Sequence, residues 1–264
     1  MGSLRRLAGT PLLLRRNLSM PVDHALLRQR PGDQFVVAFP RSGSTWVRTM
    51  LATLRDPEKG FDPYVFNETI PGVSFANLPR LRALPSPRLM FSHTAFRRSL
   101  PRVVYVVRDG RDALISYYHF STAREGKAVP FSEWFDLYAM GGFGPRWDRH
   151  VKSWLIRGQQ HLGDKLLVVR FEDLKKNPVP GLQAIASFLG LPADLQIVSR
   201  AVEMAKTEKA REREEKQWGH IQDPNASFYR GGKTGQWEEF LTGEIYAKFM
   251  KLSAEALRLA GYSL

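Results

Sequence analysis

The sequence of 264 residues contains no cysteine, and this absence excludes disulfide bonds, thiol catalysis and cysteine-ligated zinc. It also lacks any apolar run near the roughly 18 residues that a membrane-spanning helix needs. Acids are scarce, with 26 Asp and Glu against 39 Lys and Arg, so the net charge is +13. Such a charge suits an anionic partner: a nucleotide, a polyanionic substrate, a nucleic acid or an anionic membrane surface. Because a cysteine-free chain fits a reducing compartment, we expect a cytoplasmic protein.

The first 30 residues form a basic segment with six arginines and a single acid, Asp23. Its apolar run Pro11-Leu12-Leu13-Leu14 is too short for the hydrophobic region of a secretory signal. We interpret residues 1–30 as a solvated, partly flexible arm. A targeting leader and a weak contact with a membrane surface are the alternatives. Residues 31–264 are long enough for one large domain with a sizeable core.

Apolar segments that alternate with helical patterns predict the architecture of this domain. The predicted buried strands are Gln34–Phe39, Arg88–Ser92, Arg102–Val107 and Lys165–Arg170. The predicted helices are Ser44–Leu54, Asp109–Phe120, Phe131–Met140, Arg146–Gln159, Val179–Leu189, Asp194–Lys216 and Thr242–Leu259. Trp218–Gln236, rich in Gly, Asn and Pro, is predicted to be a long loop. The alternation indicates a parallel sheet with right-handed crossovers.

A phosphate-binding lysine is missing from the turn after the first strand. Phe35–Trp46 predicts a strand, a short Pro/Gly/Ser turn and the start of a helix. Backbone N–H groups, hydroxyls, the helix dipole and the Arg41 guanidinium then converge, which predicts a phosphate or sulfate site. The ATP signature G-x-x-x-x-G-K-[ST] is not satisfied. We therefore expect a different anion, bound by a single P-loop-like α/β domain with a central parallel sheet flanked by helices.

A second segment, Val103–Phe120, predicts a strand that ends at Arg108 and a helix that begins directly after it. Ligands of open α/β sheets bind at the carboxyl ends of strands, so a phosphate held between Arg108 and Ser116 is reasonable. The alternative is structural. Arg108 would then pair with Asp109 or Asp112, and Ser116 would face the interior.

A third segment, Ser227–Trp237, combines several glycines with the cations Arg230 and Lys233. Glycines let a backbone approach a ligand closely, and the cations supply charge for a phosphate. A flexible surface turn with solvated cations is the alternative when this segment is considered alone.

Together these segments resemble the cytosolic-type sulfotransferases, which use 3′-phosphoadenosine 5′-phosphosulfate (PAPS) as sulfuryl donor. Pro40–Trp46 resembles the 5′-phosphosulfate loop of that family, and Arg108–Phe120 resembles its 3′-phosphate motif. Phe228–Trp237 resembles the C-terminal R-x-G-x-x-G-x-W segment, and Val168–Pro178 resembles a fourth family segment. Four motifs in order are strong support, whereas one would be weak.

The resemblance implies a role for each site residue. The implied cofactor-binding residues are Arg41, Ser42, Gly43, Ser44, Thr45, Trp46, Arg108, Ser116, Phe228, Arg230, Gly231 and Gly232. His93, in Phe91-Ser92-His93-Thr94, resembles the family's general base and is the catalytic residue together with Arg41 and Ser116. Arg41 would face the bridging oxygen, where negative charge develops as the S–O bond breaks.

The implied reaction is in-line transfer of a sulfuryl group from PAPS to an acceptor hydroxyl or amine, with PAP as the product. We expect no metal, because protein cations can neutralise the donor, and no nucleic acid partner. The acceptor would be a small molecule, a glycan or a lipid, held by the segments 56–87 and 121–145. The sequence does not define the acceptor or the oligomeric state.

Several positions depart from the family pattern. The loop lysine is Arg41, which keeps the charge but cannot readily donate a proton. The lysine two residues before the catalytic histidine is Phe91, and a tyrosine that contacts the cofactor is Phe171. The T-S-F adenine contact matches poorly near Ala205–Thr207, and the dimer motif K-x-x-x-T-V-x-x-x-E fails in Glu238–Ala247.

Three rival hypotheses remain open on these residues. A nucleoside-triphosphate-dependent kinase on the same scaffold would need Mg²⁺ and the missing loop lysine. A non-catalytic module that binds polyanions or nucleotides would bind with steep salt dependence and without turnover. A sulfotransferase that binds PAPS without turnover would be consistent with Arg41 and Phe91.

Overall fold

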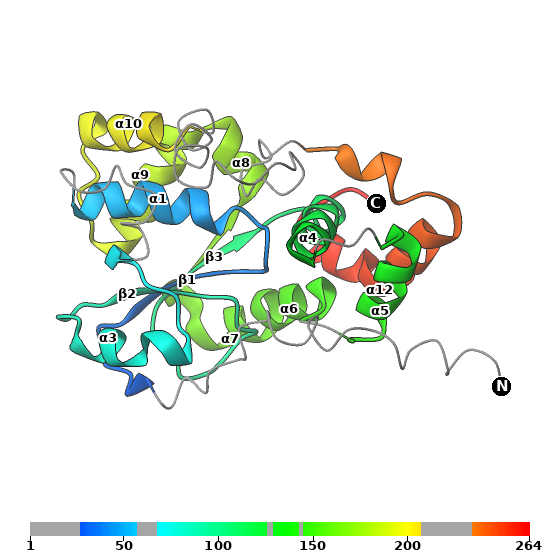
Figure 1. Ribbon diagram of the computed structural model, residues 1–264. Helices are drawn as coiled ribbons and strands as arrows, with labels where there is room; N and C mark the ends of the chain where they lie inside the picture. Colours follow the sequence, from blue (N-terminus) through cyan, green and yellow to red (C-terminus); the bar gives the residue numbers. More distant parts are fainter. Residues whose placement is uncertain (1–26, 57–67, 126–128, 143–144, 207–233) are drawn as a thin grey trace.

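The computed structural model describes residues 27–56, 68–125, 129–142, 145–206 and 234–264. Its sheet has four parallel strands in the order β2-β1-β3-β4 (Figure 1). The strands are β1 Gln34–Ala38, β2 Leu89–Ser92, β3 Val103–Val107 and β4 Leu166–Arg170. In register, β1 begins with Gln34 opposite Leu89 on one side and Phe35 opposite Val103 on the other. The four strands and their parallel order confirm the predicted α/β domain.

Two layers of helices enclose this sheet, because both faces of its strands are apolar. Along β1, Phe35 and Val37 enter one core cluster, whereas Val36 and Ala38 enter the other. The second cluster lies under α1 Ser44–Arg55, α8 Phe171–Lys176, α9 Pro178–Leu189 and α10 Leu195–Met204, which cover the upper face in Figure 1.

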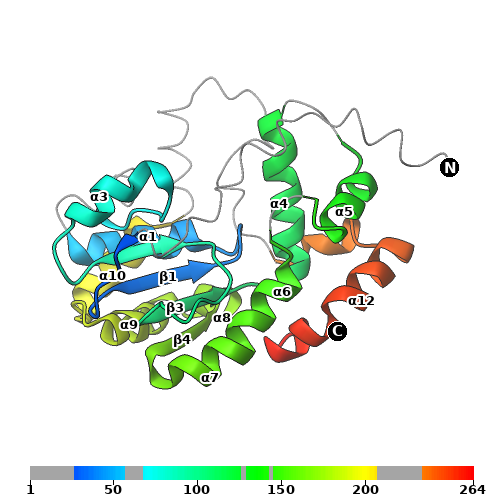
Figure 2. The same cartoon turned by 90° about the horizontal axis from the view of Figure 1, so that it is seen from below.

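The first cluster is covered by helices from the middle and the end of the chain (Figure 2). These are α3 Leu78–Ala83, α4 Gly110–Glu125, α5 Phe131–Ala139, α6 Trp147–Lys152, α7 Gln159–Leu162 and α12 Gly243–Leu259. The short helices are η4 Phe75–Asn77, η6 Gly163–Lys165 and η8 Gln236–Glu239. None of the helices in the described part of the chain is long and apolar enough to cross a membrane.

Some predicted helices differ from the structure. The prediction of one helix over Asp194–Lys216 is wrong, because α10 ends at Met204. The Asp194 carboxylate caps its start by accepting from the Gln196 amide at 2.8 Å. Arg146–Gln159 is helical, but the six residues Ser153–Gly158 are wound as a π-helix between α6 and α7.

The end of the basic arm packs on the domain. Leu27 is fully buried in the first cluster, and the Arg28 carbonyl accepts a hydrogen bond from Arg88 at 3.1 Å. Arg30 donates to the carbonyls of Arg82 and Leu84 at 2.7 and 2.8 Å. The rest of the arm lies outside the described residues, so the boundary at residue 30 stays a prediction.

Candidate active site

The turn after β1 directs the first backbone amides of α1 out of the helix end, while the Ser42 amide bonds the Phe39 carbonyl at 3.2 Å. Arg41 and Gly43 have φ angles of 67° and 86°, and these left-handed conformations fold the chain back onto the start of α1. The amide of Val47 makes the first helical bond, to the Gly43 carbonyl at 3.1 Å, so the amides before it point out of the helix end. The Ser42 hydroxyl is buried and has no hydrogen-bond partner among the described residues. This combination is a fitting receptor for an anion.

Gly43 is also confined by a neighbour. A Cβ at this position would lie 2.4 Å from the ring of Phe171, the first residue of α8. Trp46 contacts the same ring edge-on, with centroids 5.9 Å apart. The turn therefore needs glycine both for its backbone angle and for space.

Arg41, Arg108 and Ser116 come together at the carboxyl ends of β1 and β3. Arg108 is 6% exposed and donates to the Arg41 carbonyl at 3.0 Å. The Arg41 Nε donates to the Ser116 hydroxyl at 3.2 Å, and its guanidinium lies 4.7 Å from the Phe120 ring centroid. Residues far apart in the sequence thus form one cationic corner.

The acids next to Arg108 have other partners. Asp109 pairs with Arg111 at 2.7 Å, and the Asp112 carboxylate accepts from the Gly235 amide at 2.9 Å. Burial lowers the pKa of Arg108, and the nearby carboxylates, Asp112 foremost, oppose that shift. Asp112 therefore serves both the Gly235 amide and the charge of Arg108, and the role of Arg108 as a phosphate ligand stays a prediction.

His93 follows β2 and is partly buried. Its Nδ1 lies 2.6 Å from the carbonyl of Ala38, the last residue of β1. Because a carbonyl only accepts, we assign the proton to Nδ1 and the lone pair to Nε2. Burial above all, and then the charges of Arg48 and Arg41, lower the pKa of His93 to about 4, although the bond to Ala38 opposes the shift. The imidazole is therefore neutral at pH 7 and able to accept a proton.

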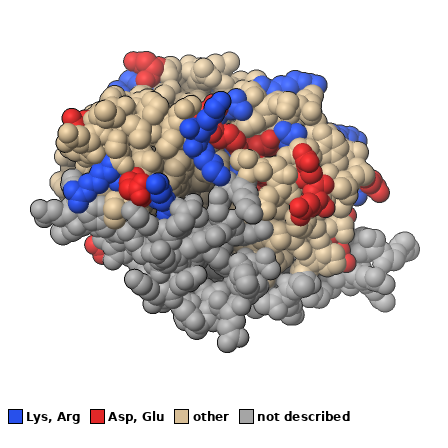
Figure 3. Space-filling model, turned by 90° about the horizontal axis from the view of Figure 1, so that it is seen from above, with Lys and Arg blue, Asp and Glu red and all other residues tan. Residues whose placement is uncertain are grey.

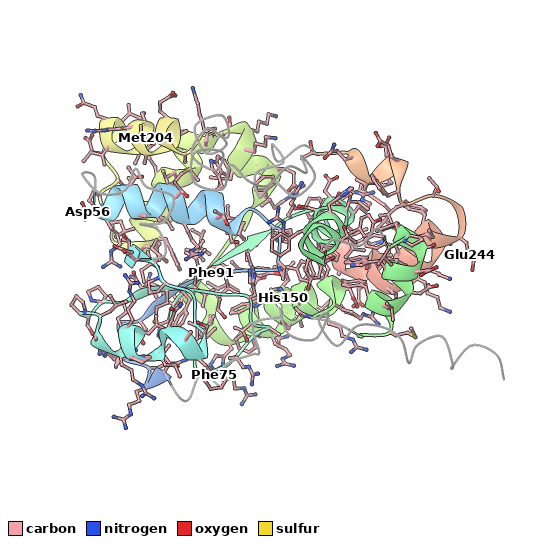
Figure 4. The ribbon with its side chains drawn as sticks, in the orientation of Figure 1. Asp56, Phe75, Phe91, His150, Met204 and Glu244 are labelled. Carbon is pink, nitrogen blue, oxygen red and sulfur yellow. The ribbon has the colours of Figure 1, made fainter. Side chains whose placement is uncertain are left out.

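Sequence reasoning missed two residues around His93. Arg48 lies one helical turn after Ser44, a spacing that could have indicated the same face of α1. His150 is fully buried, and its Nδ1 lies 3.0 Å from the Tyr105 hydroxyl. Burial, and then the neighbouring His93, lower the pKa of His150 to about 3. Figure 4 places Phe91 and His150 in the interior, near the strand ends.

Four predicted cofactor residues, Phe228, Arg230, Gly231 and Gly232, lie outside the described residues. The described end of their segment lies against α4, the helix that carries Ser116. Gly235 contacts Asp112 there, and the Trp237 ring lies 4.4 Å from the Arg111 guanidinium. The third motif thus leads towards the same corner as the first two.

The sequence profile of the sulfotransferase domain matches residues 31–261. The chain belongs to the sulfotransferase family. It is 27% identical to mouse Sulfotransferase 1B1 over 237 residues, which cover 80% of this chain and 78% of that protein. It is 26% identical to Flavonol 4'-sulfotransferase of Flaveria chlorifolia over 281 residues, covering 92% and 86%.

Solved structures share the fold of this sulfotransferase. Mouse sulfotransferase SULT7A1 complexed with PAP superposes with a TM-score of 0.68 at 21% identity, covering 90% of this chain and 92% of that one. Retinol dehydratase in a complex with retinol and PAP gives 0.69 at 20%, covering 89% and 83%. Family and fold confirm the predicted transferase class. The kinase and the non-catalytic module find no support.

The described part of the face seen from above in Figure 3 carries charges of both signs. Over α8 and α10, charges of both signs stand next to one another (Figure 3). Arg170 lies 3.8 Å from Asp173, and Lys206 pairs with Glu203. The described part of this face therefore lacks the single-sign patch that binding to a polyanion favours.

Proposed function

We propose that this sulfotransferase transfers the sulfuryl group of PAPS to a hydroxyl or amine of a small-molecule acceptor, with His93 as the general base. The observation that carries the proposal is the bond of His93 to the Ala38 carbonyl. This bond holds the imidazole against Ala38, which precedes Arg41 by three residues. The imidazole thus lies at the strand end where the amides of the β1 turn converge. Base and anion receptor thus share one edge of the sheet.

Different residues of the site bind the two phosphate ends of PAPS. The amides of Ser42 to Thr45 bind the 5′-phosphosulfate, and the Ser42 hydroxyl gains a partner there. Arg108 and Ser116 bind the 3′-phosphate together with Phe228, Arg230, Gly231 and Gly232. When bound, PAPS supplies an activated sulfuryl group on a phosphate leaving group.

Arg41 and His93 act on opposite ends of the transfer. Arg41 stabilises the charge that develops on the bridging oxygen, and its fixed guanidinium does so without giving up a proton. His93 accepts the acceptor's proton at Nε2, because Nδ1 is held by the Ala38 carbonyl. A negatively charged donor beside the imidazole raises the pKa of His93 again, which strengthens it as a base.

Turnover with PAPS and a panel of phenols, flavonols and sterol-like alcohols tests this function by mass spectrometry. His93→Ala should bind PAP like the native chain but turn over at least about 100-fold more slowly. His161→Ala, an exposed histidine of α7, is the matched control. Full activity of His93→Ala would contradict the base, and tight binding of ATP with Mg²⁺ but not of PAP would contradict the donor.

We further propose a cytoplasmic location and a domain that spans residues 31–264 after a basic arm. One relative is named Cytosolic sulfotransferase 5, of Arabidopsis thaliana. Cell fractionation tests the location, with recovery in the membrane pellet as the contrary result. A chain without residues 1–30 that keeps turnover would support this boundary, whereas turnover that survives removal of residues 1–26 but not of 1–30 would move it to residue 27.

A further inference from the structure

Arg48 places a buried cation behind the candidate base. It is 6% exposed on α1, and its Nε and Nη2 donate to the Ile70 carbonyl at 3.2 and 2.7 Å. Its guanidinium also lies 4.5 Å from the centroid of the Phe91 ring. A charge buried in this way is costly unless it has partners, so its position is fixed by the carbonyl and the ring.

The Phe91 ring connects this cation to His93. The phenyl and imidazole rings meet edge-on, with centroids 4.6 Å apart and planes at 83°. Guanidinium, phenyl and imidazole thus form a continuous stack that runs from α1 to the end of β2. Phe91 occupies the position at which the sulfotransferase family has a lysine. The strand therefore lacks the charge of that lysine, and the charge of Arg48 lies on the other side of the Phe91 ring.

The strand that carries the stack is held from the same side. Phe91 and the Pro71–Val73 segment exchange two backbone bonds, from the Val73 amide at 2.8 Å and to the Pro71 carbonyl at 3.0 Å. Arg48 binds the carbonyl of Ile70, the residue directly before that segment. A shift of Arg48 would therefore disturb both the ring and the backbone next to His93.

We propose that Arg48 is a positioning residue for His93 and that it supplies, from α1, the positive charge that the lysine at position 91 would supply. This inference rests on the proposed function, in which His93 is the base. The cation disfavours protonation of the imidazole in the free protein, and the stack holds the ring so that Nε2 stays available.

Other groups also face His93. Arg41 approaches from the β1 turn, His150 from α6, and the Ala38 carbonyl from β1. Arg41 lowers the pKa of His93 as Arg48 does, whereas the carbonyl raises it. Only Arg48 touches the Phe91 ring among the charged groups that the described structure places around His93. Its removal should therefore change the imidazole without dismantling the anion receptor.

Two substitutions separate the charge of Arg48 from its hydrogen bond. Arg48→Gln keeps a donor for the Ile70 carbonyl but loses the charge, whereas Arg48→Lys keeps the charge. In Arg48→Gln the pKa of His93, measured by NMR titration of the free protein, should rise by about 1 unit, as expected for a lost neighbouring charge. Arg48→Lys should leave it near the native value. Arg55→Gln, an exposed arginine of the same helix, is the matched control.

Activity gives a second readout. The acid limb of kcat/KM in Arg48→Gln should move to higher pH by the same amount, since it reports the ionisation of the free enzyme. An unchanged pKa in Arg48→Gln, or equal shifts in the Gln and Lys variants, would overturn the inference. If Arg48→Gln does not fold, Arg48→Met keeps the packing on Phe91 and is compared with Arg48→Lys, which alone retains the charge and a donor. Absence of turnover in the native chain would contradict the proposed function, yet the NMR comparison would still stand.

Discussion

The turn after β1 and the turn after β3 lie at the same edge of the sheet, but different parts of the chain hold them. The β1 turn, Phe39–Gly43, is shaped by backbone angles and leaves the Ser42 hydroxyl without a partner among the described residues. The β3 turn, Arg108–Gly110, is held by side chains. Glu172 accepts from the Asp109 amide at 3.1 Å, and the Trp147 indole donates to the Arg108 carbonyl at 3.2 Å.

This difference has a consequence for mutation. A receptor made of amides needs a backbone shape, so it is damaged most by any side chain that prevents that shape. A receptor built around one arginine depends on the charge of that arginine and on the side chains that hold it. Each substitution should therefore lower the affinity by the amount that the replaced side chain contributes. The two turns should therefore respond differently, although both are proposed to bind the same nucleotide at opposite ends.

Gly43→Ala should have the largest effect, because it breaks the backbone receptor. The substitution places alanine at a φ of 86° and a Cβ 2.4 Å from the Phe171 ring. We expect a loss of about 3 kcal/mol in unfolding free energy. PAP affinity should fall at least about 100-fold, since two amide contacts to an anion would be lost. Denaturant unfolding and calorimetric titration with PAP measure the two effects.

Gly190→Ala provides the control for this prediction. Gly190 ends α9 at a φ of 66°, and no atom lies within 4 Å of its added Cβ. It should cost about 1 kcal/mol of stability, from the backbone angle alone, and leave PAP affinity unchanged. Equal effects of the two alanines would show that the contact with Phe171 does not matter.

Arg108→Met should have the next largest effect, because it breaks the side-chain receptor. PAP affinity should fall about 30-fold, the value of one charge-assisted bond to a phosphate. Arg108→Lys should recover part of this loss but not all, since lysine cannot also hold the Arg41 carbonyl as Arg108 does. AMP, which lacks the 3′-phosphate, sharpens the test. If Arg108→Met weakened AMP as much as PAP, the assignment of the 3′-phosphate to Arg108 would be wrong.

Much of the fold was predictable because its signals are local. β1 and β3 consist almost wholly of apolar residues that enter two cores, so their sequence alone indicates buried parallel strands. α8 was missed because it has only six residues and continues directly from β4. The break after Met204 was missed because the charged residues beyond it continue a helical pattern.

The site was predictable where one segment builds it and unpredictable where several segments meet. The seven residues Pro40–Trp46 are enough to predict an anion receptor at the β1 turn. In contrast, Arg41 and Ser116 are 75 positions apart, and their contact depends on the order of β1 and β3 in the sheet. Arg48 gave only the signal of its spacing from Ser44 on α1, because its proposed role depends on contact with a ring from β2.

Gly110→Ala tests the support under the β3 turn. Gly110 has no left-handed angle, but its Cβ would lie 2.5 Å from the indole of the fully buried Trp147. We expect about 2 kcal/mol of destabilisation from overpacking. PAP affinity should fall less than about tenfold, because Arg108 keeps its charge. Gly32→Ala, whose Cβ would meet only Pro87 at 3.8 Å, is the control. A loss of affinity as large as that of Arg108→Met would show that Trp147 fixes the arginine.

Tyr262→Phe should have the smallest effect and tests how far the side-chain network extends. The Tyr262 hydroxyl donates to Glu172 at 2.6 Å, and Glu172 in turn holds the Asp109 amide. Burial raises the pKa of Tyr262, so the hydroxyl remains a donor at any physiological pH. Its loss should cost about 1 kcal/mol of stability. PAP affinity should stay within about twofold, because Glu172 keeps its bond to the turn. A tenfold loss of affinity would instead make the C-terminal residues part of the receptor, and the β3 turn would then depend on supports far beyond its own strand.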